Sequence, residues 1–540
     1  MMMAFSGNDG AGKSTMAYSL YNLLRLCGVN VEYHEEFKHF ILQYVSKIMK
    51  KRVEYERRIL KRIPYRKGSS LKYRLWAIAV LIDSMLEREF SRIFRKEGLT
   101  ILDRCIIDHL ASFEYIGCLT NLTRKLFINA PRPDLVIVLD APPKLMYERK
   151  KNTHNFPYRF YVIQQKRYYE LAKYLSLPLI NTSKPINETL EEVVHILVKN
   201  ISKRQENLVL HVLSDPLGKS DFKLIDEVDF RKLDYMYLLV EASRNNVELQ
   251  FFKKLLNYDI PSKWSRILEE IISTLIQNNS KIVNKLIDVV ELLEKNGINY
   301  CIFKTFPIFE SVPRDIDIIV DNYKDAIKLL KNKGYVITKS HIRQKEVSLM
   351  KEGVEFDVHW DIGWNGESVV DIRELFKNVT ITEIDGYPIN VPNSNYELLL
   401  VMAHAVLQHH YLTLGELHYI RSIIYYNNIY WRKIFHHALE QDWMHGLMKA
   451  LGIIKLKDLF YYSSELFDRI PVVKNLGINI MEIEDPVSWI THFNYKPLKS
   501  VKDFIKSSST AYRYYRWRIT RKLPFNEPSP HVLRLLSKYR

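Results

Sequence analysis

The feature that most constrains this chain is a glycine-rich motif that directly follows a short apolar segment near the N-terminus. Residues 1–6 are predicted to form a strand, and residues 14–26 carry apolar side chains at helical spacing. Between them stands the pattern G-x-x-x-x-G-K-[ST], made of Gly7, Asn8, Asp9, Gly10, Ala11, Gly12, Lys13 and Ser14, with Thr15 next. A glycine loop that joins a strand to a helix is typical of sites that bind phosphate groups.

Each part of this motif has a chemical purpose. The glycines let the backbone curl so that successive N–H groups point at phosphate oxygens. Lys13 is expected to reach the β- and γ-phosphates of a bound nucleoside triphosphate, and the Ser14 hydroxyl is expected to bind Mg²⁺. A chance glycine turn is the alternative, but the 540 residues include only 18 glycines, which disfavours it. We therefore predict that residues 7–15 bind a nucleoside triphosphate together with Mg²⁺.

The first 200 residues alternate between predicted strands and predicted helices. Further strands are predicted at 29–33, 99–102, 134–140 and 177–181, and further helices at 76–94, 157–174 and 187–198. Because strands that alternate with helices form parallel sheets, the expected fold is α/β, a P-loop NTPase parallel sheet with helices on both faces.

The pattern changes near residue 202. Residues 222–297 are mostly helical in pattern, and short strands are predicted at 300–304, 316–320, 355–359 and 387–391. An apolar helix is predicted at 396–408, and the remainder is expected to be helical. We predict four parts: a P-loop domain at 1–203, a helical segment at 204–299, an α+β core at 300–395, and a helical C-terminal region with a basic aromatic tail at 396–540.

Charged residues follow two strands of the P-loop domain. Asp103 and Arg104 end one predicted strand, and basic residues that include Arg149 and Arg159 follow another. A carboxylate at Asp103 can reach Mg²⁺ through water or meet the acceptor, and the arginines can clamp the transferring phosphate. The alternatives are an ordinary ion pair at a strand end and a solvated basic helix face.

Three segments in this order resemble the thymidylate kinase family: residues 5–15, residues 103–104, and residues 133–143 followed by Glu148 and Arg149. The resemblance covers about residues 1–200. It implies transfer of phosphate from Mg-ATP to a nucleoside monophosphate. It also implies that Asp9 lies near the acceptor sugar, that the Asp103–Arg104 pair lies beside the acceptor phosphate, and that residues 182–185 lie near adenine.

The chain departs from that family at two positions on the acceptor side. Residues 33–37 replace the usual Arg-Glu-Pro segment, and Cys105 stands where the family has an aromatic residue. We expect ATP to be the donor, and the sequence leaves the acceptor open.

A second group of carboxylates lies in the predicted α+β core. Asp315 and Asp317 are two residues apart on one strand, and Asp357 lies on another strand. Adjacent carboxylates can hold divalent cations that bind a nucleoside triphosphate. A surface strand with ordinary acidic residues is the alternative.

Residues 303–304, 314–320, 334–335, 357–360 and 386–388 resemble the nucleotidyltransferase superfamily, over about residues 225–430. The resemblance implies that Asp315, Asp317 and Asp357 bind metal. The family has a glycine after the lysine, whereas this chain has Thr305, Phe306 and Pro307. Nucleotidyl transfer and a degenerate binding domain therefore both remain open.

Four histidines lie in a region of predicted helix: His404, His409, His410 and His418. They lack the spacing typical of metal ligands, so packed or exposed histidines are favoured over zinc ligands. The four cysteines also lack such spacing, which favours a reduced, intracellular protein. Apolar runs reach about eight residues, well short of a bilayer span of ~20, and no signal peptide is evident. The expected location is the cytoplasm.

The chain is basic, with 79 Lys and Arg against 62 Asp and Glu, a net charge of +17. Residues 47–74 carry a surplus of 10 positive charges and residues 511–540 a surplus of seven. Such segments favour nucleic acid or an anionic membrane surface, and a solvated or core-docked basic helix is the alternative for the second. Expected partners are thus ATP, a small anionic acceptor, one of these polyanionic surfaces, and a second copy of the chain in a homodimer.

Three hypotheses follow from the sequence. The first is an enzyme whose first 203 residues phosphorylate a nucleoside monophosphate or a related small acceptor, fused to a nucleotidyltransferase-like domain. The second makes nucleotidyl transfer the main activity. The third is a protein that binds nucleic acid or membrane under the control of ATP.

Overall fold

The computed structural model describes residues 1–34, 71–94, 98–153, 156–307, 309–341, 344–364 and 367–490, with residues 512, 515, 516 and 519. These residues divide into two compact units. The first comprises Met1–Ile201 and Lys474–Met481, and the second comprises Ser202–Val473 and the residues from Glu482 onward. The basic segments at 47–74 and 511–540 lie outside the described residues, apart from 71–74 and the four isolated positions.

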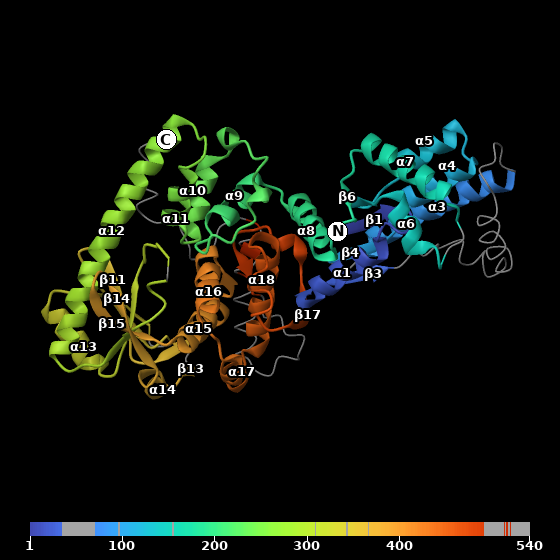
Figure 1. The fold of residues 1–540 in the computed structure, drawn as a ribbon. Coiled ribbons are helices and arrows are strands. Elements are labelled where there is room, and N and C mark those ends of the chain that lie inside the picture. Colours follow the sequence, from blue (N-terminus) through green and yellow to red (C-terminus); the bar gives the residue numbers. More distant parts are fainter. Residues whose placement is uncertain are drawn as a thin grey trace. The chain divides into compact units, whose positions relative to one another are not determined.

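The first unit contains a five-stranded parallel sheet (Figure 1). Its order is β3-β4-β1-β5-β6, and every neighbouring pair is parallel. The strands are β1 (Met2–Gly7), β3 (Val31–His34), β4 (Leu99–Asp103), β5 (Leu135–Asp140) and β6 (Leu179–Asn181). β5 is almost entirely buried, as expected for a central parallel strand whose sequence is almost continuously apolar.

Helices cover both faces of this sheet. One face packs against α3 (Leu71–Phe94), α4 (Ile106–Ile116), α5 (Asn121–Asn129) and α7 (Tyr158–Tyr174) in a common apolar core. α1 (Lys13–Leu26) and α8 (Ile186–Ile201) contact each other and the strands, and α6 (Pro143–Lys150) packs against α7. The predicted α/β sheet with helices on both faces is confirmed.

The predicted strand at 29–33 is in fact two strands. β2 (Cys27–Val29) leaves the main sheet and pairs with β17 (Val473–Ile478), and only β3 joins the parallel sheet. The backbone N–H of Asn30 donates to the Ile478 carbonyl at 3.0 Å. The prediction that the C-terminal region is helical was therefore wrong at β17. The local sequence pattern does not reveal this strand because its partner, β2, lies more than 400 positions earlier in the chain.

The second unit begins with helices, as the pattern of 222–297 predicts. They are α9 (Gln205–Leu213), α10 (Tyr235–Arg244), α11 (Glu248–Leu255) and the long α12 (Ser262–Lys295), with short 3₁₀ turns η1 (Phe222–Leu224) and η2 (Phe230–Lys232). The second half of α12 lies beside the sheet that follows (Figure 1). Its apolar side chains belong to the same hydrophobic core as those of that sheet.

That sheet has five strands in the order β7-β8-β11-β10-β9. They are β7 (Tyr300–Ile302), β8 (Ile316–Val320), β9 (Val336–His341), β10 (Glu346–Lys351) and β11 (Val354–His359). Only the β8–β11 pair is parallel. With α13 (Tyr323–Asn332) packed against it, the sheet forms the predicted α+β core. β9 and β10, whose side chains do not alternate cleanly, were missed by the sequence pattern.

Smaller elements complete the second unit. Two hairpins follow the sheet, β12 (Ile362–Trp364) with β13 (Glu367–Val370) and β14 (Val379–Ile384) with β15 (Tyr387–Pro392), with α14 (Ile372–Phe376) between them. The later elements are α15 (Ser394–Ala403), the π-helical turn η3 (His404–His409), β16 (Tyr411–Leu412), α16 (Leu414–Tyr426), α17 (Trp431–Glu440), α18 (Met444–Tyr461), η4 (Ile480–Glu482) and β18 (Ser488–Trp489).

The helix predicted at 396–408 is α-helical only to Ala403 and then widens into η3. His410 adopts a left-handed conformation, with φ of 64°, which ends the helix. β16 pairs with β18, so the C-terminal region is not purely helical as expected. Within the described residues, no helix combines the length and apolarity needed to cross a membrane.

Candidate functional site

The glycine motif forms the connection between β1 and α1. Gly7, Gly10 and Gly12 have φ angles of 145°, 85° and 91°, a region that side chains strongly disfavour. A Cβ atom at Gly7 would lie 2.3 Å from the Leu139 carbonyl oxygen, and one at Gly10 would lie 2.6 Å from the Met146 carbonyl oxygen. Glycine is therefore required both for the backbone conformation and for the close approach of neighbouring main chain.

Lys13 curls back over this loop. Its Nζ donates to the carbonyl oxygens of Gly7 at 2.8 Å and Asn8 at 3.0 Å, and the residue is only 5% exposed. Burial, together with the nearby Arg104 guanidinium, lowers the pKa of Lys13. The ammonium group is thus held inside the loop by two carbonyl oxygens, at the place where the motif predicts a phosphate-binding lysine.

Asp103 and Ser14 form the candidate magnesium site of this unit. Burial raises the pKa of Asp103, and a hydrogen bond with the Ser14 side chain acts in the opposite direction. Among the described residues, the buried Asp103 Oδ1 has no hydrogen-bond partner. A carboxylate with an unused buried oxygen beside a hydroxyl matches the oxygen donors that Mg²⁺ prefers. Ser14 and Asp103 therefore fit the role of Mg²⁺ ligands.

Asp9 and Arg104 meet across the adjacent strands β1 and β4. Arg104 donates to Asp9 Oδ1 at 3.1 Å, and Lys13 Nζ lies 3.9 Å from the same oxygen. Arg104 has a φ of 102°, unusual for a residue with a side chain, and such backbone strain clusters at functional sites. The parallel pairing of β1 and β4 thus brings together two predicted site residues 95 positions apart.

Asp108 was missed by the sequence analysis although it organises this site. Its carboxylate accepts from the backbone N–H of Gly7 at 3.3 Å, from that of Cys105 at 2.8 Å, and from the Tyr168 hydroxyl at 3.0 Å. Asp108 therefore ties the start of the glycine loop to the start of α4. α4 was not among the predicted helices, and the usable signal was an acidic residue three positions after Cys105, where it can cap a helix that begins at Ile106.

Arg149 and Arg159, the two arginines predicted to clamp the transferring phosphate, occupy different settings. Arg149, at the end of α6, donates to the carbonyl oxygens of Gly10 at 3.1 Å and Thr182 at 3.0 Å. The Thr182 hydroxyl donates to the Ala11 carbonyl oxygen at 2.8 Å, which brings the segment after β6 against the loop. Arg159 lies exposed in the first turn of α7. Of the two, only Arg149 is hydrogen-bonded to the glycine loop.

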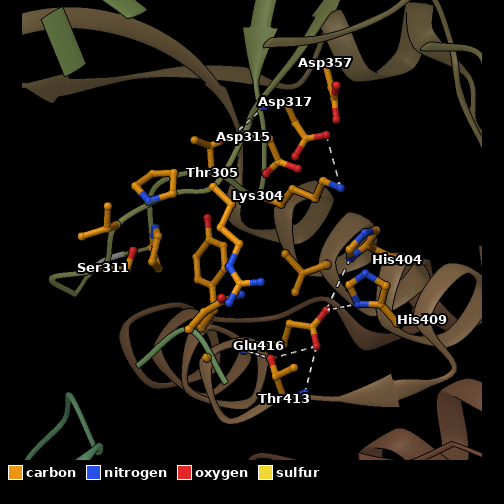
Figure 2. Close-up of a pocket in the computed structure, with 18 of the residues that line it drawn as sticks. Lys304, Thr305, Ser311, Asp315, Asp317, Asp357, His404, His409, Thr413 and Glu416 are labelled. Carbon is orange, nitrogen blue, oxygen red and sulfur yellow. Dashed lines mark hydrogen bonds and ion pairs between the residues drawn. The ribbon is translucent and has the colours of Figure 1, made fainter. Parts of the chain in front are cut away.

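The carboxylates of the second unit line a pocket of about 240 Å³ (Figure 2). Asp317 on β8 stands directly opposite Asp357 on β11 in the parallel register, and Asp315 lies just before β8. Lys304, Glu346 and several residues between Val401 and Tyr419 complete the wall. The predicted convergence of the three aspartates is therefore present.

Asp317 is the most tightly held of the three. Its Oδ1 lies 3.3 Å from Lys304 Nζ and 3.0 Å from His359 Nε2. Burial alone would raise the pKa of Asp317, but Lys304 and His359 outweigh it and lower the pKa to about 2. Burial alone would likewise lower the pKa of Lys304, and the Asp317 and Asp315 carboxylates raise it. Asp317 and Lys304 therefore form an ion pair at the base of the pocket.

Asp315 and Asp357, unlike Asp317, form no ion pair with any of the described residues. Asp315 is open to the pocket, yet the surrounding protein and the Asp317 carboxylate raise its pKa to about 7. Burial and Asp317 also raise the pKa of Asp357, whose Oδ1 has no hydrogen-bond partner among the described residues. Crowded carboxylates with an unused oxygen fit the binding of a divalent cation such as Mg²⁺, which would relieve their repulsion.

Thr305 occupies the position where glycine was expected, and it has a structural use. Its hydroxyl donates to the Phe303 carbonyl oxygen and accepts from the Asp317 backbone N–H, both at 3.0 Å. The preceding Lys304 has a φ of 48°, and its N–H donates to Glu397 Oε1 at 2.8 Å. The turn after β7 is thus fixed by the side chains of Thr305 and Glu397.

Sequence reasoning assigned no role to His359, Glu346 or Glu397, which all surround Lys304 and Asp317. His359 shares a face of β11 with Asp357, so the two-residue strand period was a usable signal for it. Glu346 lies on the unpredicted strand β10, and Glu397 comes from α15, so only the tertiary fold brings them here.

The four histidines of the C-terminal region separate into two pairs. His410 is buried at the left-handed turn, and His418 is buried with its Nε2 2.9 Å from the Ser214 hydroxyl. His410 and His418 are therefore packed histidines, as the sequence analysis favoured. His404 and His409 instead line the pocket of Figure 2, together with Glu416.

Comparison with known proteins separates the chain along the same division. Residues 237–456 match the family model described as "Uncharacterised nucleotidyltransferase". The chain is 26% identical over 206 residues to the "Probable thymidylate kinase 1" of Saccharolobus solfataricus, an alignment that covers 37% of this chain and 98% of that protein. It is 28% identical over 207 residues to the "Probable thymidylate kinase" of Sulfolobus acidocaldarius, covering 36% and 95%.

Two solved structures also align with about the same share of the chain. A thymidylate kinase from Ehrlichia chaffeensis aligns over 36% of this chain and 98% of its own, with 19% identity and a TM-score of 0.25. A deoxyadenosine kinase from M. mycoides aligns over the same shares, with 17% identity and a TM-score of 0.25. The N-terminal 200 residues or so are similar in sequence to proteins named as probable thymidylate kinases, and residues 237–456 match a nucleotidyltransferase family model.

Proposed function

We propose that residues 1–203 transfer the γ-phosphate of ATP to a nucleoside monophosphate or a related small anionic acceptor. The observation that carries this proposal is the meeting of Lys13, Ser14, Asp103 and the Asp9–Arg104 pair at one end of the parallel sheet. The similarity of this segment to proteins named as thymidylate kinases supports it. Because the chain departs from that family at residues 33–37 and at Cys105, the proposal does not restrict the acceptor to thymidylate.

In the proposed reaction, an oxygen of the acceptor phosphate attacks the γ-phosphorus and ADP leaves. Negative charge spreads over the oxygens of the transferring group, and positively charged groups fixed around it lower the barrier. Lys13 supplies one such charge from within the loop, and Arg104 supplies another beside Asp9. Mg²⁺ held by Ser14 and Asp103 would neutralise charge on the ATP phosphates.

The proposal is tested by ADP release from Mg-ATP with a panel of nucleoside monophosphates. We expect one class of monophosphate to stimulate ADP release, and Lys13→Ala to reduce the stimulated rate by ~100-fold or more, because it removes a charge directed at the transition state. Lys166→Ala is the matched control, since Lys166 is a 79% exposed lysine on α7 of the same unit.

Wild-type turnover in Lys13→Ala would refute the kinase assignment. Stimulation of ADP release by polynucleotide or anionic lipid, with no response to any monophosphate, would instead support an ATP-controlled binding protein. The basic segments at 47–74 and 511–540 would then be the first regions to truncate.

A second activity is favoured by the pocket of the other unit. We propose that Asp315, Asp317 and Asp357 bind divalent cations that hold an NTP, and that an acceptor oxygen attacks its α-phosphorus, so that the nucleotide is transferred and pyrophosphate leaves. The support is the facing register of Asp317 and Asp357 and the available oxygen of Asp357. Incorporation of labelled nucleotide into acceptor, lost in Asp315→Ala, is the measurement. Wild-type incorporation in that variant would contradict the proposal.

A further inference from the structure

Two histidines and a glutamate converge on one side of the pocket in the second unit, across from the aspartates (Figure 2). Glu416 Oε1 lies 3.4 Å from His404 Nδ1 and 3.0 Å from His409 Nδ1. One candidate ligand atom from each of the three side chains lies within 4.8 Å of the other two. The side chains are 12%, 25% and 15% exposed for His404, His409 and Glu416, so they are partly sheltered but reachable from the pocket.

The backbone explains how these histidines come to share a face. His404 and His409 are five residues apart, which in an α-helix would place them far apart around the axis. They are the first and last residues of the π-helical turn η3, whose i→i+5 hydrogen bonds place residues five apart above one another. Their rings accordingly lie 4.1 Å apart, centroid to centroid. Such π-helical turns are frequent at functional sites.

Glu416 is held so that one oxygen faces both histidines. Its Oε2 accepts from the Thr413 backbone N–H at 2.9 Å and from the Thr413 hydroxyl at 3.1 Å, as part of the capping box that begins α16. This leaves Oε1 toward the imidazole rings. A carboxylate that binds a metal ion through one oxygen is usually held in place by outer-shell hydrogen bonds, and Thr413 supplies such bonds to the other oxygen of Glu416.

The distances agree with those of a coordination site. Ligand atoms placed ~2.1 Å from a tetrahedral Zn²⁺ lie about 3.4 Å from one another. The separation of 3.4 Å between His404 and Glu416 matches this value, and the 3.0 Å separation between His409 and Glu416 is close to it. Two imidazole nitrogens with one carboxylate oxygen, and further coordination positions open to a pocket, is a ligand set that binds zinc in enzymes.

We propose that His404, His409 and Glu416 bind a divalent transition metal of the zinc class, at a site separate from the aspartates. Imidazole ligands favour Zn²⁺ over Mg²⁺, whereas Asp315, Asp317 and Asp357 offer only oxygen and favour Mg²⁺. His404, His409 and Glu416 line the same pocket as the three aspartates. In a role that rests on the proposed nucleotidyl transfer, a metal ion bound by them would hold an oxygen of the acceptor or of the nucleotide.

The test is a metal-binding measurement on the full chain. Protein stripped with a chelator is titrated with Zn²⁺ and with Co²⁺, and binding is followed by calorimetry, by the visible absorption of bound Co²⁺ and by elemental analysis. We expect one equivalent to bind in an excess of Mg²⁺. His409→Gln and Glu416→Gln should each weaken binding by more than ~100-fold, beyond the ~10–100-fold cost of losing an outer-shell partner.

The chain supplies matched controls. His436 and Glu440 form an exposed pair on α17, 3.2 Å apart, so His436→Gln removes a histidine beside a glutamate outside the pocket and should leave zinc binding unchanged. Asp315→Asn removes a carboxylate on the other side of the pocket and should also leave it unchanged. Glu416→Gln can keep the capping box, because glutamine also serves at this position of the motif. This variant therefore tests metal coordination without disturbing the start of α16. Circular dichroism without metal checks that each variant is folded.

Three outcomes would overturn the proposal. The first is that the wild type binds less than one equivalent of Zn²⁺. The second is that His409→Gln and Glu416→Gln bind Zn²⁺ with the affinity of the wild type. The third is that His436→Gln loses as much affinity for Zn²⁺ as these two variants do. The first would mean that Glu416 only accepts hydrogen bonds from the two histidines. Because the measurement is binding and not turnover, its failure is distinguishable from a failure of the proposed nucleotidyl transfer.

Discussion

Glu397 shows how a single buried carboxyl can make stability depend on pH. It is 8% exposed, and its Oε1 accepts from the Lys304 N–H at 2.8 Å and from the Tyr419 hydroxyl at 2.5 Å. Burial raises the pKa of Glu397 from its ordinary value of 4.5 to about 7, although both hydrogen bonds favour the ionised form. The folded protein therefore binds a proton at Glu397, between pH 4.5 and pH 7, that the unfolded chain releases.

Glu397→Gln is expected to remove this pH dependence. Because the folded-state pKa is raised, the free energy of unfolding of the wild type falls as pH rises from about 4.5 to 7. Glutamine has no such proton, so the free energy of unfolding of the variant relative to the wild type should rise by up to ~3 kcal/mol between pH 5 and pH 8. Urea unfolding at several pH values measures it.

The control for this prediction is Glu383→Gln, because Glu383 is exposed on β14. Its unfolding curves should run parallel to those of the wild type at every pH. Parallel curves for Glu397→Gln as well would show that Glu397 is ionised in the folded protein throughout this range.

At the scale of elements, pairing between distant segments decides the edge of the first unit. Gly28, in β2, has a φ of 78°, and a Cβ atom there would lie 2.9 Å from Leu476 Cδ1 and 3.0 Å from Leu476 Cβ. β17, which carries Leu476, belongs to the same compact unit although it lies near the other end of the chain. The glycine therefore allows both the turn out of α1 and the close approach of β17.

Gly28→Ala is expected to destabilise the first unit by about 1–3 kcal/mol, from backbone strain and from collision with Leu476. Leu476→Ala removes Cγ and Cδ and should relieve part of the collision, so the double variant should be more stable than the sum of the single effects by ~0.5 kcal/mol or more. A double-mutant cycle from thermal or urea unfolding measures this coupling.

Gly218→Ala provides the comparison for that cycle. Gly218 also has a positive φ, 64°, but no atom lies within 4 Å of a Cβ built there. Its effect should add to that of Leu476→Ala without coupling. If the destabilising effects of Gly28→Ala and Leu476→Ala were strictly additive, the result would show that β17 does not pack on β2.

At the scale of the molecule, the chain holds two sites in two compact units. The glycine loop with Asp103 and Arg104 lies wholly in the first unit, and the aspartate pocket lies wholly in the second.

The two proposed activities should therefore separate cleanly. Lys13→Ala should abolish acceptor-stimulated ADP release and leave incorporation of labelled nucleotide at its wild-type rate. Asp315→Ala should have the reverse effect, because each substitution removes a charge from one site only. Both assays on both variants complete the comparison. Loss of both activities in either single variant would show that the sites act on one coupled reaction.

The sequence alone determined the parts of this protein that local rules control. The glycine loop needs a strand, three glycines, a lysine and a hydroxyl within 15 residues, and the alternation of strands and helices fixes a parallel sheet. The convergence of Asp315, Asp317 and Asp357 was predictable for the same reason, since the two-residue period of a strand sets which side chains share a face.

Only the tertiary structure decided the rest, because the partners come from distant segments. Asp108 reaches Gly7 across about 100 residues, and β2 reaches β17 across more than 400. His404 and His409 have a spacing that no α-helix would bring together, and the change to a π-helical turn places them beside Glu416. Helical period and motif spacing assume regular backbone geometry, so a site built on an irregular turn is visible only after the chain has folded.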